Sequence, residues 1–175
     1  MEYQLKQCTE KQLSEIMAIF NEAILNTTAL YDYKPRTLEM MQTWYNYKQK
    51  GNYKIIGAFD ESNTLLGFAT YGPFREQPAY KYTVEHSIYV RSDKRGNGLG
   101  KTLLEKIINE VEEQDYHLLV GVIDASNSVS IHLHEMEGFV FCGLIKESGF
   151  KFGKWLDVAF YQKTLKTPKN PEDDC

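Results

Sequence analysis

A strand-like stretch, a glycine-rich turn and a helix-like stretch follow one another near the middle of the chain. Residues 82–90 read YTVEHSIYV, and residues 91–101 read RSDKRGNGLGK. From residue 98 to residue 112, apolar side chains then recur at helical spacing. This stripe consists of Leu99, Leu103, Leu104, Ile107, Ile108 and Val111. The strand and the helix that follows it favour an α/β fold.

Further strand and helix signals surround this segment on both sides. Helices are expected over 9–25 and 37–51, where Thr9 and Thr37 are the N-terminal caps, and over 125–138. Strands are expected at 3–8, 53–59, 64–71, 117–123, 139–145 and 154–165. The order β-α-α-β-β-β-α-β-α-β-β predicts one domain with a mixed sheet over 1–165, followed by a polar, frayed tail over 166–175.

Composition and charge narrow the function classes. The net charge of −4 argues against a broad nucleic-acid-binding surface. The chain lacks 18 consecutive apolar residues and a signal-peptide pattern, so we expect no membrane partner. Its three cysteines are few and widely spaced, which favours a reducing cytoplasm as its location. Cys8, Cys142 and Cys175 form no C-x-x-C pair, which argues against a disulfide framework or a zinc ribbon. Cys142, in FVFCGLI, is expected to be a buried core thiol.

The glycine turn has the chemistry of an anion-binding site. Backbone N–H groups at a helix N-terminus lack internal partners, the helix dipole adds partial positive charge, and glycine permits close approach. Phosphate is the natural ligand of such a turn. A P-loop would need glycine in place of Arg95, and a dinucleotide-binding motif would need glycine in place of Leu103. Neither pattern fits this turn. The alternative to an anion-binding site is a glycine-rich turn that binds no ligand.

The spacing R-x-x-G-x-G, from Arg95 through Gly98 to Gly100, resembles the pyrophosphate-binding motif of the GCN5-related N-acetyltransferase (GNAT) superfamily. Four stretches resemble its phosphinothricin acetyltransferase branch: YTVEHSIYVRSDKRGNGLG, GVIDASNSVSIHLHEMEGF, LYDYKPRTLE and GFKFGKWLDV. The resemblance implies a single α/β domain with a mixed, mostly antiparallel central sheet flanked by helices. It also implies acetyl-CoA as the acyl donor and a homodimer.

The resemblance further implies which residues contact acetyl-CoA. The backbone of the strand before the turn pairs with the pantetheine arm, and the main-chain N–H groups of the turn hold the pyrophosphate. This set is Ile88, Tyr89, Val90, Arg95, Gly96, Asn97, Gly98, Leu99, Gly100, Lys101 and Asn127. An N-cap of the following helix is a second, compatible role for Asn127.

Two side chains match the catalytic positions of the branch. Glu85, in YTVEHS, is the expected general base for the acceptor amine, or the residue that orients a base water. The alternative is a glutamate that faces bulk solvent. His134, in LHEMEGF, stands where many superfamily members carry a tyrosine, and it is the expected donor to the leaving thiolate. The alternative is a histidine packed in the core. His132 and His134 point apart on a helix, which argues against a metal site.

The branch acetylates the α-amino group of small amino-acid analogues such as phosphinothricin, methionine sulfone and methionine sulfoximine. By the same resemblance, the acceptor is expected to contact Tyr31, Phe74, Arg75 and Tyr80. One alternative is a peptide N-terminus or a polyamine as the acceptor. Another is a module that binds acetyl-CoA without turnover.

Overall fold

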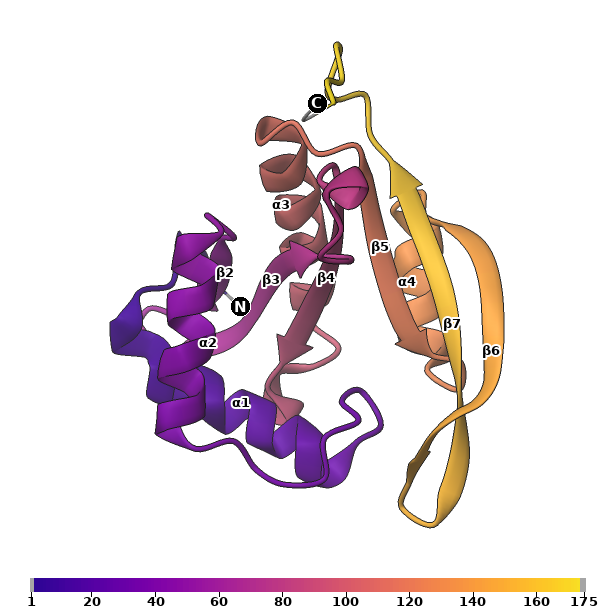
Figure 1. Cartoon of the computed structure of the whole chain (residues 1–175). Coiled ribbons are helices and arrows are strands. Elements are labelled where there is room, and N and C mark those ends of the chain that lie inside the picture. Colours follow the sequence, from indigo (N-terminus) through magenta and orange to yellow (C-terminus); the bar gives the residue numbers. More distant parts are fainter. Residues whose placement is uncertain (1, 174–175) are drawn as a thin grey trace.

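A computed structural model describes residues 2–173 of the chain, and Cys175, at the end of the predicted tail, lies outside the described residues (Figure 1). Within these residues one sheet has the strand order β1-β2-β3-β4-β5-β7-β6. Its strands are β1 (Gln4–Gln7), β2 (Ile55–Phe59), β3 (Leu65–Pro73), β4 (Thr83–Val90), β5 (Leu118–Asp124), β6 (Val140–Lys151) and β7 (Lys154–Thr164). Only the β4–β5 pair is parallel among them. The predicted mixed, mostly antiparallel sheet is confirmed.

Helices cover both faces of this sheet (Figure 1). They are α1 (Leu13–Asn26), α2 (Leu38–Lys50), α3 (Leu99–Glu113) and α4 (Ser128–Met136). Alternate strand residues supply the two cores, because successive side chains of a strand point to opposite faces. Ile56 and Ala58 of β2 pack with the predicted stripe of α3, whereas Ile55 and Phe59 pack with α1 and α2. Within residues 2–173, no helix is both long and apolar enough to cross a membrane.

The helix caps form as their sequences predict. The Thr9 hydroxyl accepts from the backbone N–H of Lys11. The backbone N–H of Thr9 donates to Gln12 Oε1 at 2.9 Å, which completes a capping box. Thr37 Oγ1 accepts from Met40 N at 3.3 Å at the start of α2. Asn127 Oδ1 accepts from Ser130 N at 3.0 Å at the start of α4. These bonds use N–H groups that each helix leaves without an internal partner.

The strands β4 and β5 pair over only part of their length. Thr83–Glu85 pairs with Leu118–Val120, and beyond this point the strands diverge (Figure 1). β4 continues to Val90 alongside β3, and β5 continues to Asp124 alongside β7. The sheet is therefore continuous at one end of these strands and open at the other.

The edge strand β6 differs from its sequence-based prediction. The predicted strand ends at residue 145, whereas β6 continues to Lys151, with an irregular register between Ile145 and Gly149. The prediction that Cys142 is a buried thiol is wrong, because an edge strand leaves side chains open to solvent and Cys142 is exposed. The buried free thiol is Cys8.

The tail is ordered further than its polar sequence suggests. Thr167 Oγ1 donates to Tyr116 O at 2.6 Å, and Glu172 N donates to the Tyr82 hydroxyl at 3.1 Å. These residues therefore have partners next to the sheet, and the fraying of the tail stays a prediction.

Candidate active site

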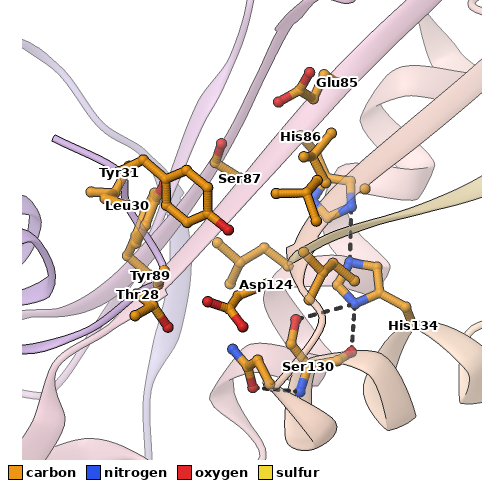
Figure 2. Close-up of a pocket in the computed structure, with 17 residues that line it drawn as sticks. Thr28, Leu30, Tyr31, Glu85, His86, Ser87, Tyr89, Asp124, Ser130 and His134 are labelled. Atoms are coloured by element: carbon orange, nitrogen blue, oxygen red, sulfur yellow. Dashed lines mark hydrogen bonds between the residues drawn. The ribbon is translucent and has the colours of Figure 1, made fainter. Parts of the chain in front are cut away.

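A cavity of about 300 Å³ lies where β4 and β5 diverge (Figure 2). Its walls come from β4 (85–89), β5 (121–124), Val158 of β7, the loop 28–31 that follows α1, and α4 with its cap Asn127. Both predicted catalytic residues, Glu85 and His134, line it. The structure therefore brings together residues that are about fifty positions apart in the sequence.

Glu85 lies on β4, where it forms the last residue pair of the β4–β5 ladder with Val120. Burial raises the pKa of its carboxyl group, and the positive charges of Arg75 and Lys48 oppose this shift only in part. A carboxylate with a raised pKa is a stronger base than an exposed one. The site therefore suits Glu85 for accepting a proton.

Lys48 is a buried cation that the sequence analysis missed. Its Nζ atom donates to Tyr71 O at 2.6 Å, and its side chain is only 7% exposed. Gly72, the next residue of β3, is the register partner of Glu85. Burial lowers the pKa of Lys48 to about 8, although the negative charge of Glu85 acts in the opposite direction. One sequence signal was available, because Lys48 follows Met41 and Trp44 at helical spacing on the apolar face of α2.

His86 and His134 form a stacked pair in the wall of the cavity (Figure 2). Their Nε2 atoms are 3.1 Å apart, and His134 Nδ1 is 2.6 Å from Ser130 O. A carbonyl oxygen only accepts, so His134 Nδ1 carries the proton and its Nε2 accepts from His86. Burial lowers the pKa of both rings, that of His86 to about 3, so both are neutral near pH 7.

This pairing limits what His134 does in the arrangement seen here. Both of its ring nitrogens are bonded within the protein, and the shared Nε2 proton belongs to His86. Donation to a thiolate requires that proton to move to His134, so the general-acid role stays a prediction. Gly121 makes the pair possible, because a Cβ atom there would lie 3.0 Å from His134 Cδ2 and 3.2 Å from His86 Nε2. The sequence analysis missed His86, because its partner His134 is 48 positions away and no local pattern pairs the two.

The glycine turn has the backbone geometry of an anion site. Gly96 and Gly98 have φ of 79° and 77°, a region that favours glycine. The N-terminus of α3 has no side-chain cap, and the space beside both glycines is open. Arg95 is engaged elsewhere, since its guanidinium contacts Val90 O at 3.2 Å and Glu22 Oε2 at 3.0 Å. The free N–H groups of this turn fit a pyrophosphate.

The predicted acetyl-CoA residues are divided between two places. Ile88, Tyr89 and Asn127 line the cavity. The remaining residues lie outside its lining, on the end of β4 and around the N-terminus of α3. These are Val90, Arg95, Gly96, Asn97, Gly98, Leu99, Gly100 and Lys101.

The predicted acceptor residues do not share one cavity. Tyr31 lines the cavity at the β4–β5 divergence, where its hydroxyl points toward Asp124 (Figure 2). Arg75 and Tyr80 line a second cavity of about 450 Å³. The Phe74 ring packs between Arg75 and Tyr80: its centroid is 5.8 Å from the centroid of the Tyr80 ring and 4.2 Å from the Arg75 guanidinium carbon.

Comparison with known proteins identifies the family. A model of the acetyltransferase (GNAT) domain matches residues 5–160. The chain belongs to the GNAT acetyltransferases. This confirms the sequence-based resemblance, and the chain is an N-acetyltransferase that depends on acetyl-CoA.

Individual GNAT relatives match over almost the whole chain. The L-methionine sulfoximine/L-methionine sulfone acetyltransferase of Pseudomonas paraeruginosa is 41% identical, over 87% of this chain and 89% of its own. A solved structure from Acinetobacter baylyi has 52% identity and a TM-score of 0.98, and the match covers 99% of this chain and 97% of that one. A GNAT superfamily phosphinothricin acetyltransferase from Sinorhizobium meliloti, in complex with AcCoA, has 32% identity and a TM-score of 0.94, over 99% and 95% of the two chains.

Proposed function

We propose that residues 1–165 form a catalytic domain that acetylates the α-amino group of a small amino-acid-like acceptor. Methionine sulfoximine, methionine sulfone and phosphinothricin represent this class. The observation that carries the proposal is the 41% identity to a methionine sulfoximine/methionine sulfone acetyltransferase over 87% of the chain. A cavity of about 300 Å³ lined by a buried carboxylate, Glu85, supports it.

Glu85 is the proposed general base. An alkylammonium group has a pKa of about 10, so the acceptor amine must lose a proton before it attacks the thioester carbonyl. Glu85 takes this proton, directly or through a water molecule, and its raised pKa strengthens it as a base. His134, through the proton shared with His86, is the proposed donor to the leaving thiolate.

The proposed acetyl-CoA contacts follow the strand β4 and the glycine turn. The main chain of Ile88, Tyr89 and Val90 faces the open end of the β4–β5 pair, where a pantetheine arm adds hydrogen bonds as a strand does. The uncapped N-terminus of α3 and the turn from Arg95 to Lys101 hold the pyrophosphate. Asn127 contacts the donor while it caps α4.

Tyr31 and Arg75 are the proposed acceptor contacts, with Phe74 and Tyr80 around Arg75. The Tyr31 hydroxyl is buried and has no hydrogen-bond partner among residues 2–173, so it is available to a ligand. The cavity at the β4–β5 divergence is lined by neither lysine nor arginine. Arg75, whose charge acts on Glu85, is therefore the proposed partner of the acceptor carboxylate.

We also propose that the enzyme is a homodimer in the cytoplasm. The edge strand β6 and the start of β7 expose a row of large apolar side chains. They are Phe141, Leu144, Ile145, Phe150 and Trp155. A long apolar edge strand is normally covered by another chain. The free thiols of Cys8 and Cys142 support a reducing compartment.

Release of the CoA thiol from acetyl-CoA tests the proposed acceptor class. The panel comprises phosphinothricin, methionine sulfone, methionine sulfoximine, spermidine and a short peptide with a free N-terminus, with the Glu85→Gln variant as a control. We expect release with the three amino-acid analogues only. Release with spermidine or the peptide alone would overturn the acceptor class, and tight acetyl-CoA binding without any release would favour a non-catalytic binding module.

A further inference from the structure

The tip of the β6–β7 hairpin contacts the loop that forms one wall of the cavity. This loop runs from residue 27 to residue 36, between α1 and α2, and Thr28, Leu30 and Tyr31 line the cavity. The hairpin lies more than a hundred residues further along the chain. Its residues Gly149, Phe150 and Lys151 contribute nothing to the cavity lining.

Lys151 makes the main contact between the hairpin and the loop. Its Nζ atom donates to Thr27 O at 2.8 Å and to Leu30 O at 2.5 Å. The residue is only 3% exposed. A buried ammonium group is costly unless hydrogen bonds satisfy it, so its bonds to two loop carbonyls strongly favour one loop conformation. Burial lowers the pKa of Lys151, while the negative charge of Asp32 opposes this shift.

Two aromatic residues of the loop strengthen this attachment. The Tyr33 hydroxyl donates to Phe150 O at 2.5 Å. The Tyr31 ring lies against the backbone at Gly149, where an added Cβ atom would be 2.6 Å from Tyr31 Cε2. The ring therefore needs the open space that glycine leaves. The same ring carries the unpartnered hydroxyl that points into the cavity (Figure 2).

We infer that Lys151 is a positioning residue of the acceptor site, which fixes the carbonyls of Thr27 and Leu30 and thereby holds Tyr31 against the acceptor. This inference rests on the proposed function, in which Tyr31 of this loop contacts the acceptor. The predicted acetyl-CoA contacts lie on β4, the glycine turn and α4, and Lys151 bonds to none of them. Lys151 therefore controls acceptor affinity and leaves donor affinity unchanged.

The Lys151→Met variant tests this inference, because methionine keeps an unbranched side chain and removes the ammonium group. Lys146→Met is the matched control, since Lys146 is an exposed lysine of the same strand. Tyr33→Phe is a second variant that removes only the exposed hydroxyl bond to Phe150. KM is measured for the panel amine that the wild type acetylates, alongside the Kd of acetyl-CoA and amide hydrogen exchange over residues 27–36.

We expect Lys151→Met to raise the acceptor KM by about tenfold or more, with the Kd of acetyl-CoA changed by less than about twofold. Hydrogen exchange over 27–36 should become faster, Tyr33→Phe should give smaller changes in the same direction, and Lys146→Met should give none. Faster exchange with an unchanged KM in both variants would overturn the link to the acceptor. Unchanged exchange in both would overturn the positioning role itself.

The same experiment separates this inference from the proposed function. If the wild type acetylates only spermidine or the peptide, the proposed acceptor class fails, yet the KM comparison with that amine still tests Lys151. If no amine is acetylated, the proposed function fails. In that case, unchanged amide hydrogen exchange over 27–36 in the variants overturns the inference as well. The inference fails too if exchange becomes faster while the NMR shifts of the Tyr31 ring protons stay those of the wild type.

Discussion

Replacement of Lys48 by methionine should change the stability of the enzyme in a strongly pH-dependent way. Lys48 is 7% exposed, and its charge lies under the β3–β4 ladder near Glu85. Methionine keeps most of the packing against Trp44 and Tyr53, whose ring centroids are 5.7 Å and 5.8 Å from Nζ. The substitution therefore removes mainly the buried charge and the hydrogen bond to Tyr71 O.

The magnitude follows from the pKa of Lys48, which burial lowers from 10.5 to about 8. At about 1.4 kcal/mol per pKa unit, the charged side chain destabilises the folded chain by roughly 3 kcal/mol. This cost applies in full below the folded-state pKa, where both states carry the charge, and it vanishes above the unfolded-state pKa, where both are neutral. Loss of the bond to Tyr71 O costs about 1–3 kcal/mol; it offsets part of the gain at low pH and outweighs the gain at high pH.

Urea unfolding of the wild type and of Lys48→Met measures the difference in the free energy of unfolding. Between about pH 7 and about pH 10, the advantage of the variant should fall by roughly 2 kcal/mol or more. Lys50→Met, on the same helix but exposed, should show almost no such change. An equal stability difference at both pH values would refute the assignment of a strained, charged Lys48. The variant should also shift the acidic limb of kcat to higher pH, because Glu85 loses a favourable charge.

Four further predictions concern the proposed catalytic residues, the glycine turn and the dimer interface. Glu85→Gln should lower kcat most near neutral pH and less at high pH, where the amine deprotonates unaided; a pH-independent loss would indicate a structural role. His134→Ala should lower kcat with unchanged acetyl-CoA affinity, and normal kinetics would leave the histidine pair as core packing. Gly98→Asp should weaken acetyl-CoA binding by about 100-fold in calorimetry through charge repulsion, with Gly98→Asn as the neutral control; equal affinities would remove the turn from the anion site. Trp155→Arg should convert a dimer to a monomer in sedimentation, and an unchanged mass would exclude this edge from the interface.

Most of the fold was predictable because its signals are local. The apolar stripe of α3, from Leu99 to Val111, is buried as its spacing predicts. The caps at Thr9 and Thr37 depend on residues three positions away, so the sequence alone specifies them. Cys142 shows where this reasoning fails, since an apolar run in an edge strand looks the same as one in the core.

The candidate site was predictable only where it matched a family motif. Glu85 and His134 were found by resemblance, and both line the cavity. Lys48, His86 and Lys151 were missed because their partners, Tyr71, His134 and the loop after α1, lie far away in the sequence. A buried polar side chain is explained by its bonds, and no local pattern states which distant group will complete them.

The short β4–β5 ladder makes the supply of the acyl donor a determinant of how long the enzyme survives. The β4–β5 ladder has three residue pairs and is the shortest ladder of the sheet, so we expect local opening to begin there. In the proposed binding mode, acetyl-CoA contacts β4 in one half and Asn127, after β5, in the other, so it would stabilise the folded molecule by about 2.7 kcal/mol at a concentration one hundred times its Kd. We therefore expect proteolysis of the purified enzyme to slow when acetyl-CoA is added, and its abundance in cells to follow the abundance of its donor.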